Sequence, residues 1–276
     1  VIVLISLLGL VGNGIVLWFL GFRIKKNPFT VYVLNLAAAD FGCLFCLSVS
    51  LTINVLCLSR LLLLMICLDL LFLFMLSTSL YLLTAISADR CVSVLFPIWH
   101  RCRRPTHLSA IVCALLWALS CLLTGVRFFV CFLDSSKHCF LVVTDLTATN
   151  FLIFTPIMVL SSLILIIKVQ CSSQRRPPGK LYVVILLTIL FFLIFVAPLS
   201  IVTFFHNVFF HYNLITIILM LASMNSSINP VIYFFVGSYR NRQFRRSVKK
   251  ALHSVFEEEA ARSKGRVSAI EIPTGA

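Results

Sequence analysis

The stretch SADRCVSVLFPIWHRCRRP, residues 87–105, begins where a long and almost wholly apolar run comes to an end. An acid and a base, Asp89 and Arg90, stand side by side in it, and the basic residues Arg101, Arg103 and Arg104 follow. Lys and Arg concentrate next to the ends of membrane-spanning helices. The stretch is therefore interpreted as the place where a transmembrane helix leaves the lipid.

The composition supports a membrane protein. The chain has 276 residues, of which 61% are hydrophobic and only 12% are charged, whereas about a quarter of the residues of a soluble domain are charged. The formal net charge is +14. A basic chain can bind nucleic acid, but here the charges form short clusters between apolar runs. No basic domain stands apart, so nucleic acid is not an expected partner.

Seven apolar stretches are long enough to span a membrane as helices, which takes about 20 residues each. Backbone groups in lipid need internal hydrogen-bond partners, so the stretches are expected to be packed helices. The predicted fold class is an all-α integral membrane protein, a seven-transmembrane helix bundle. The predicted spans are 1–22, 29–54, 59–92, 107–131, 142–168, 180–206 and 213–237.

The basic residues predict the orientation of the bundle. Clusters of Lys and Arg follow the first, third, fifth and seventh spans, so all of them fall on one side of the membrane. Basic loops stay in the cytoplasm, which places the N-terminus outside the cell and the C-terminus inside. The clusters begin with Arg23, Arg101, Arg175 and Arg240.

Two of the 11 cysteines flank a predicted extracellular loop. Cys131 and Cys139 flank the stretch FLDSSKH, on the predicted extracellular side. That compartment is oxidising, and a disulfide between the two residues is the favoured interpretation. The alternative is a pair of free thiols.

Polar side chains inside the spans are costly in lipid and often functional. Carboxylate, hydroxyl and amide oxygens are hard ligands that suit a small cation such as sodium. The same groups also hold helices together by hydrogen bonds, and both interpretations stay open. The residues concerned are Asn13, Asp40, Ser79, Asn225, Ser226 and Asn229.

No catalytic pattern is found along the sequence, and an enzyme is not expected. The histidines show no zinc-site spacing, and phosphate-loop and nucleophile-elbow motifs are missing. A transporter or ion pathway that uses Asp40 is one candidate function. Transporters usually show a repeat between their two halves, and none is evident here.

Several phrases resemble the class A, rhodopsin-like G protein-coupled receptors, and within them the Mas-related receptor family. The class marks are GN at 12–13, LNLAAAD at 34–40, DRC at 89–91, Trp117, Pro156, Pro198 and NPVIY at 229–233. The family marks are NPFTVYVLNLAAAD, LLTAISADRCVSVLFPIWHRCRRP, ALLWALSCL and NSSINPVIYFFVGS. The class marks fall in the expected order over all seven spans.

The resemblance implies roles for two motifs. In such receptors the resting Arg90 is held by Asp89, in a triplet completed by Cys91, and it faces the G protein after activation. Tyr233 is expected to swing inward, next to Asn229 and Pro230. The sodium site of the class maps onto Asp40, Ser79, Asn225, Ser226 and Asn229, which strengthens the cation interpretation. No organic cofactor is implied.

The sequence also departs from the class. Val196 stands where most class A receptors have a switch Trp, Ile164 replaces a Tyr of the fifth span, and no acid near Pro178 is placed to hold Arg90. These changes suggest a resting state that is held less firmly and a receptor with basal activity.

The resemblance also locates a ligand pocket at the predicted extracellular ends of the helices. Amine receptors have an Asp at the position of Phe72, so a monoamine ligand is not favoured. Arg127 stands where Mas-related receptors often have an acid, which predicts a peptide, acidic or zwitterionic ligand. The alternative is that Arg127 pairs internally with Asp145. The predicted pocket residues are Asp69, Phe72, Arg127, Phe128, Asp145, Phe204 and Phe205.

The chain is expected to have three parts. Residues 1–237 form the receptor domain, 238–256 an amphipathic cytoplasmic helix (the eighth of such receptors) with apolar residues on one face, and 257–276 a disordered cytoplasmic tail. The implied location is the plasma membrane. The implied partners are a heterotrimeric G protein, an extracellular ligand, membrane lipid and arrestin.

Overall fold

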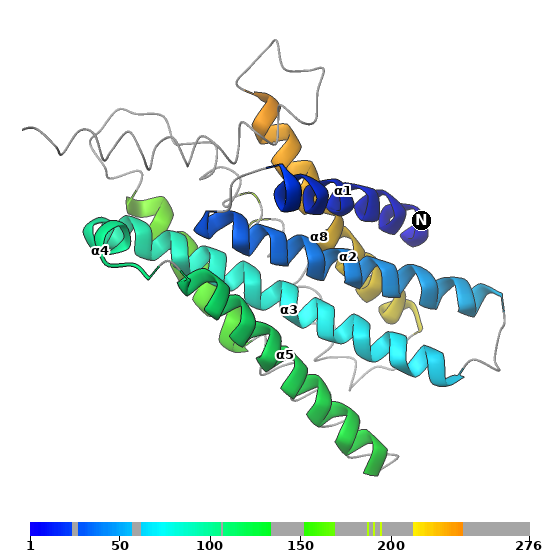
Figure 1. The fold of residues 1–276 in the computed structure, drawn as a ribbon. Coiled ribbons are helices and arrows are strands. Elements are labelled where there is room, and N and C mark those ends of the chain that lie inside the picture. The colour runs from blue at the N-terminus through cyan, green and yellow to red at the C-terminus, as the bar shows by residue number, and fades with distance from the viewer. Residues whose placement is uncertain are drawn as a thin grey trace, which may run out of the picture.

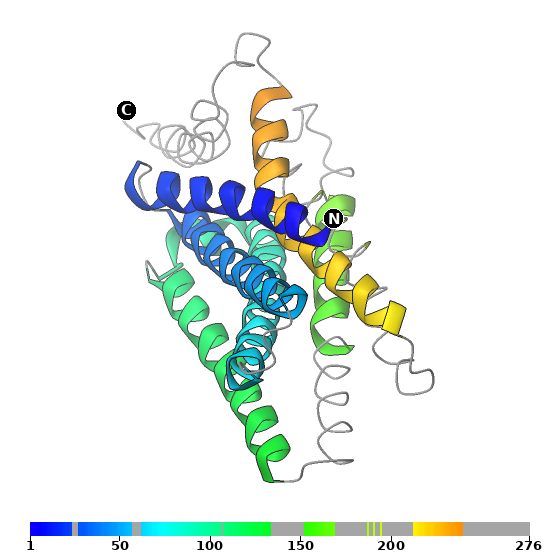
Figure 2. The ribbon, with the colours of Figure 1, turned by 90° about the vertical axis from the view of Figure 1, so that its right-hand side faces the viewer.

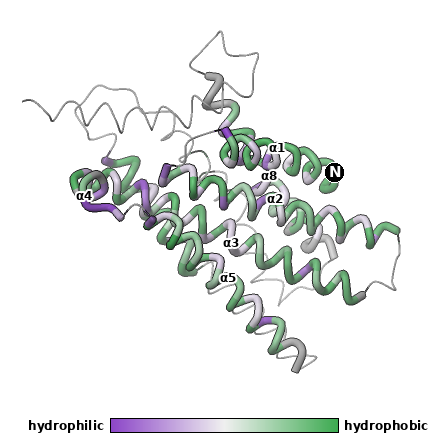
Figure 3. Tube along the Cα trace, in the orientation of Figure 1, coloured by the Kyte–Doolittle hydropathy of each residue, from purple (hydrophilic) through white to green (hydrophobic). Residues whose placement is uncertain are grey.

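The computed structural model describes residues 1–23, 27–56, 62–105, 107–133, 152–168, 187, 190, 194 and 212–239, and all regular structure within these residues is helical. Figure 1 shows α1, α2, α3 and α5 as long helices that run obliquely past one another, with the short α4 at one end. In Figure 3 the helices are mostly hydrophobic, and hydrophilic residues gather near α4. We refer to this end as the basic end.

The long helices agree with the predicted spans. Four described helices are long and apolar enough to cross a membrane: α1 (Ile2–Phe22), α2 (Pro28–Val55), α3 (Leu62–Leu95) and α5 (Leu108–Leu133). The predicted span 213–237 appears as α8 (Tyr212–Tyr239), and the shorter apolar helix Leu152–Lys168 matches the second half of the predicted span 142–168. Almost all of the predicted span 180–206 lies outside the described residues.

The start of α2 is determined by its first four residues. Pro28 occupies the first turn, where its missing N–H costs nothing. The Asn27 side chain accepts a hydrogen bond from the Thr30 backbone N–H at 2.7 Å, and Thr30 Oγ1 accepts one from the Asn27 N–H at 2.8 Å. This reciprocal capping satisfies two backbone donors at a helix end.

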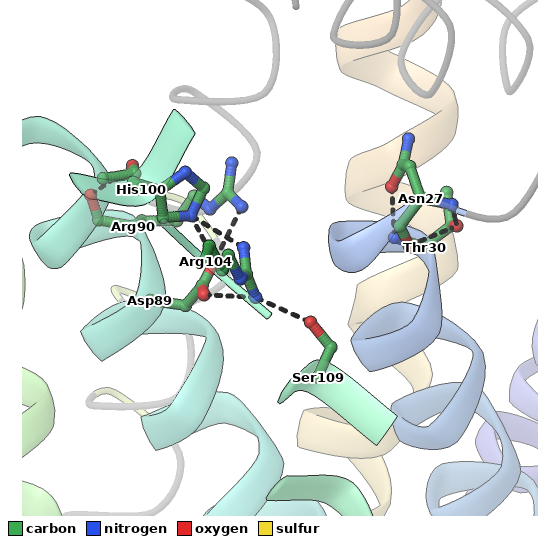
Figure 4. A network of polar contacts seen from close by, with 8 residues as sticks. Asn27, Thr30, Asp89, Arg90, His100, Arg104 and Ser109 are labelled. Atoms are coloured by element: carbon green, nitrogen blue, oxygen red, sulfur yellow. Dashed lines mark hydrogen bonds and ion pairs between the residues drawn. The ribbon is translucent and has the colours of Figure 1, made fainter. Parts of the chain in front are cut away.

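The end of α3 differs from the sequence prediction. The predicted span stops at residue 92, but α3 continues to Leu95, which places Asp89 and Arg90 inside its last turns. Proline disfavours helix at the preceding residue, and Phe96 before Pro97 is not helical. A separate helix, α4 (Pro97–Cys102), then begins. It turns Arg104, which follows it, back toward α3 (Figure 4).

The core lies between α2 and its neighbours. The helix α2 packs against α1, α3, α5 and α8, and it has the largest buried share of the four apolar helices. Large apolar side chains on the outer faces, such as Leu8, Trp18 and Leu122, stay exposed. In water such faces would be unfavourable, but lipid solvates them, so the burial pattern fits a bundle inside a membrane.

Polar contacts link α3 and α5 to other helices. Ser87 Oγ lies 3.2 Å from Ser162 Oγ of the helix Leu152–Lys168, which runs beside α3 (Figure 2). Trp117 Nε1 of α5 donates to Asn35 Oδ1 of α2 at 3.0 Å. Between apolar helices in lipid, such contacts fix helix position because hydrophobicity alone does not.

Candidate functional site

The first cluster of functional groups is an ion-pair network at the basic end of α3. Arg90 Nη2 lies 2.7 Å from Asp89 Oδ2, and the two side chains are only 9% and 10% exposed. The Arg90 guanidinium also lies over the Phe29 ring of α2, 5.2 Å from its centroid, within the range of a cation–π contact. The acid and the base that open the sequence argument therefore contact each other directly.

A second arginine joins the same carboxylate. Arg104 Nη2 lies 2.8 Å from Asp89 Oδ1 and donates to Ser109 Oγ of α5 at 2.6 Å, while Arg104 Nη1 lies 2.7 Å from His100 Nε2 of α4. Figure 4 shows these groups converging between α3, α4 and α5. In the sequence, Arg104 is only one member of a basic cluster. Its contact with Asp89 depends on α4, whose six residues are too few for periodicity to predict a helix.

His100 is placed to act as a neutral acceptor in this network. Burial lowers its pKa from the ordinary value, Asp89 opposes that effect, and Arg104 and Arg90 add to it. An arginine has no acceptor atom, so the short contact with Arg104 assigns the lone pair to Nε2 and the proton to Nδ1. The neutral ring therefore fits beside two guanidinium groups.

The second cluster surrounds Asp40 in the middle of the bundle. Ser79 Oγ of α3 donates to Asp40 Oδ1 at 2.8 Å, and Asn229 Nδ2 of α8 donates to Oδ2 at 2.7 Å. Asp40 and Ser79 are 0% exposed and Asn229 is 2% exposed. Ser79 and Asn229 thus both contact Asp40, as the predicted polar cluster requires, and their hydrogen bonds connect α2, α3 and α8.

Polar atoms without well-formed hydrogen bonds lie in the same region. Ser226 Oγ, Asn225 Nδ2 and Asn13 Oδ1 are buried and make no well-formed hydrogen bond with any described residue, although Ser226 Oγ lies beside the Asp40 carboxylate. Buried polar atoms normally have partners, often ordered water or an ion. Oxygens from Asp40, Ser79 and Ser226 are the hard donors that a small cation prefers, so these residues fit a sodium ion. Among the described residues, no group of three or more His, Cys, Asp or Glu side chains is placed to hold a metal ion.

Pro230 has a structural consequence that the sequence analysis missed. A proline lacks the N–H that would bond to the carbonyl four residues earlier, which here belongs to Ser226. Asn13 Nδ2 of α1 donates to that carbonyl at 3.0 Å. The signal is present in the sequence, because a proline always frees that carbonyl, but the identity of the donor requires the fold. Tyr233, one turn further along, is 3% exposed.

The described members of the predicted ligand pocket differ in their surroundings. Phe72 is 9% exposed and packs in a core cluster with residues of α2 and α8. Asp69 accepts a long hydrogen bond, 3.4 Å, from Ser50 Oγ. Arg127 is 3% exposed and Phe128 49% exposed. Asp145, Phe204 and Phe205 lie outside the described residues, as does Cys139 of the predicted disulfide with Cys131. The pocket and the disulfide stay predictions.

Comparison with known proteins identifies the family. The model of the 7 transmembrane receptor (rhodopsin family) matches residues 12–233. Proto-oncogene Mas of Rattus norvegicus is 44% identical over 99% of this chain and 88% of its own length. Mas-related G-protein coupled receptor member H of Rattus norvegicus is 44% identical over 91% of this chain and 81% of its own length. The chain belongs to the Mas-related receptors of the rhodopsin family.

Family membership determines the overall fold and the general function of the protein. A Mas-related receptor is a seven-transmembrane helix bundle, so the protein crosses the membrane several times and signals through G proteins in response to a ligand. The family consists of signalling receptors, not enzymes. A third similar protein, Mas-related G-protein coupled receptor member D of Macaca fascicularis, is 43% identical over 92% of this chain and 82% of its own length. The receptor interpretation is thus favoured over a transporter that uses Asp40.

Proposed function

We propose that this receptor lies in the plasma membrane with its basic end in the cytosol and transmits the signal of an extracellular ligand to a heterotrimeric G protein through Arg90. The observation that carries the proposal is the placement of Arg90, held on Asp89 at the basic end and only 7% exposed. An Arg near a helix end can exchange one charged partner for another. Its release from Asp89 would expose a guanidinium to the G protein.

A G protein activation assay tests this role. Cells that express the receptor or its Arg90→Ala variant are treated with a panel of small peptides and acidic metabolites, and signals are divided by the number of receptors at the surface. Ligand-dependent activation is expected in the parent and not in the variant. Arg23→Ala is the matched control because Arg23 is at the same end but lies over Trp18. Full signalling by Arg90→Ala would reject the proposal.

The orientation has its own test. Epitope tags on the two ends of the chain are probed with antibody on intact and on permeabilised cells. An N-terminal tag that is stained on intact cells and a C-terminal tag that is stained only after permeabilisation agree with the predicted orientation. The reverse pattern would remove the G protein from the Arg90 end, and with it the proposed role.

The proposed ligand class is a peptide or a small acidic or zwitterionic molecule. Arg127 supports this class, because a guanidinium binds carboxylates in a bidentate manner, and Asp69 adds one acidic group on α3. The Arg127→Glu variant is expected to shift the ranking of active ligands toward basic ones. An unchanged ranking over the same panel would reject this pocket. Arrestin and membrane lipid remain proposed partners.

We further propose that Asp40, Ser79 and Ser226 hold a structural sodium ion, with Asn225 and Asn229 beside it. The fully buried Ser226 Oγ, which lies beside the Asp40 carboxylate without a well-formed hydrogen bond to it, supports the proposal. The ion would neutralise a carboxylate whose burial in lipid is otherwise costly. In this arrangement the helices α2, α3 and α8 would share one cation, which favours a single packing of the three.

A further inference from the structure

The carboxylate of Asp89 is shared by two arginines that come from different parts of the chain. Arg90, the next residue of α3, contacts Oδ2, and Arg104, from the connection between α4 and α5, contacts Oδ1. The distances are 2.7 and 2.8 Å, so neither arginine is a remote neighbour. Figure 4 shows the two guanidinium groups on the one acid.

Arg104 is anchored independently of Arg90. Its side chain is 5% exposed. It donates to Ser109 Oγ at the start of α5 and lies in hydrogen-bond contact with the His100 ring of α4. These two contacts do not involve α3, so Arg104 keeps its position near Asp89 when Arg90 moves away.

The charge balance of the cluster makes the two contacts compete. Two guanidinium charges face one carboxylate charge. The His100 ring accepts a hydrogen bond from Arg104, as a neutral imidazole does, and burial lowers its pKa. Charges of the same sign at this separation repel, and the repulsion is stronger where water is scarce. Arg104 therefore weakens the attraction that Asp89 exerts on Arg90.

Release of Arg90 would normally leave a buried carboxylate without a partner. Removing one member of a buried ion pair is strongly unfavourable for that reason. With Arg104 in place, the Asp89 carboxylate keeps a charged hydrogen-bond partner after Arg90 has left. Arg104, in the connection between α3 and α5, is therefore already in place as the replacement partner of the Asp89 carboxylate.

We propose that Arg104 is a positioning residue that lowers the free energy needed to separate Arg90 from Asp89, and so raises the basal and ligand-dependent activity of the receptor. The inference rests on the proposed role of Arg90 and adds a regulator of that role. According to this proposal, Arg104 in the connection between α3 and α5 determines how readily the receptor activates.

The test uses full-length receptor fused to a Gα subunit, with one fusion for each of the main Gα classes, and measures the rate of GTPγS uptake without ligand. Arg104→Gln is expected to lower the rate that the receptor adds to that of Gα alone, by roughly threefold to tenfold, as for the loss of one nearby charge. Arg104→Lys keeps the charge and should retain most of the parent rate. Arg103→Gln removes an exposed charge next to Arg104 and should match the parent.

A second pair of variants separates this effect from a loss of loop structure. In an Asp89→Asn receptor the acid for which the two arginines compete is gone, so adding Arg104→Gln should leave the rate unchanged. A rate that falls equally in both backgrounds would point to a purely structural role of Arg104 and overturn the proposal. An Arg104→Gln rate equal to or above that of the parent, including the case in which neither exceeds Gα alone, would overturn it too.

The Arg90→Ala fusion distinguishes failure of this inference from failure of the proposed function. If Arg90→Ala loses nucleotide exchange while Arg104→Gln behaves as the parent, only the role of Arg104 is rejected. If Arg90→Ala exchanges nucleotide as the parent does, the role of Arg90 is rejected and that of Arg104 with it.

Discussion

At the scale of single residues, Asn13 and Pro230 form a matched pair. The proline leaves the Ser226 carbonyl without its helical partner, and the Asn13 amide supplies the missing hydrogen bond from α1. In lipid no water replaces a lost backbone partner. The Asn13 amide therefore compensates for Pro230, a residue of another helix that is more than 200 positions away in sequence.

We expect the Asn13→Ala variant to lose about 1–3 kcal/mol of stability, the cost of a buried carbonyl left unsatisfied. In a Pro230→Ala background the helix can donate its own N–H to the Ser226 carbonyl, so the same change at Asn13 should cost less. Thermal unfolding of the purified receptor and the three variants measures both effects. Additive losses in the double variant would contradict the pairing.

The network around Asp89 contains a residue whose charge depends on pH. His100 lies within reach of Asp89, Arg90 and Arg104, and Tyr32 of α2 is close to Asp89, Arg104 and Ser109. Burial lowers the pKa of His100, with Asp89 opposing and the arginines adding to the effect. A proton on Nε2 would remove the acceptor for Arg104 and place a third positive group in the cluster.

Acidification is therefore expected to weaken the folded receptor through His100. Because the folded pKa lies below the ordinary value of about 6.5, the unfolded chain binds the proton more readily, and stability falls as the pH drops below about 6.5. The Tm of the parent should fall more than that of His100→Gln between about pH 7.5 and 5.5. His107→Gln is the control, since His107 is exposed. Equal falls in the parent and His100→Gln would contradict this assignment.

At the scale of helices, α1 and α8 pack closely because of small residues. A Cβ on Gly9 would meet Ser227 Oγ, with Leu44 Cδ1 at 2.6 Å and Ser227 Cβ at 2.8 Å, and a Cβ on Gly12 would lie 3.0 Å from Pro230. Ser227 Oγ donates to the Ile5 carbonyl at 3.2 Å. Small residues let helix backbones approach in membranes, where van der Waals packing holds helices together.

The Gly9→Ala variant should be destabilised by about 1–3 kcal/mol through overpacking, partly offset by the better helix propensity of alanine, worth about 1 kcal/mol. Gly14→Ala, in the same helix, has only Phe41 at 3.7 Å and should keep or gain stability. Tm and surface expression of the two variants are the measurements. A Gly9→Ala receptor as stable as Gly14→Ala would show that α1 and α8 are not held this closely.

The helices also show what the sequence could and could not predict. The spans were predictable because lipid demands long apolar stretches, and the meeting of Asp40, Ser79 and Asn229 because polar groups in spans turn toward one another. The short α4 was not predicted, because six residues carry too little periodicity to indicate a helix. Because α4 was not predicted, the contact of Arg104 with Asp89 could not be predicted either.

At the scale of the whole molecule, α3 connects two polar clusters at different depths. Ser79 belongs to the Asp40 cluster and Asp89 to the ion-pair network. The separation of ten positions from Ser79 to Asp89 corresponds to about 15 Å at 1.5 Å per residue. Since the first cluster also includes α2 and α8, and the second includes α4 and α5, a shift of α3 along its axis would disturb both. The position of α3 therefore affects the packing of most of the described helices.

A sodium ion at the first cluster should therefore stabilise the whole receptor. A ligand that binds only the folded state adds RT ln(1 + [L]/Kd), about 2.7 kcal/mol at a hundredfold excess over Kd. Replacing sodium chloride by N-methylglucamine chloride at equal ionic strength is expected to lower the Tm of the parent by several degrees.

The Ser226→Ala variant tests whether the sodium ion binds at the Asp40 cluster. The Ser226 hydroxyl lies beside the Asp40 carboxylate without a well-formed hydrogen bond to it, so its removal should change the Tm less without sodium than with it. With sodium present, the variant should lose most of the stabilisation, because an oxygen ligand is gone. Ser48→Ala is the control, since among the described residues Ser48 Oγ bonds to the Leu44 carbonyl of its own helix and not to the Asp40 cluster. The same sodium dependence in all three receptors would place the ion elsewhere and leave the buried Ser226 hydroxyl to a water molecule.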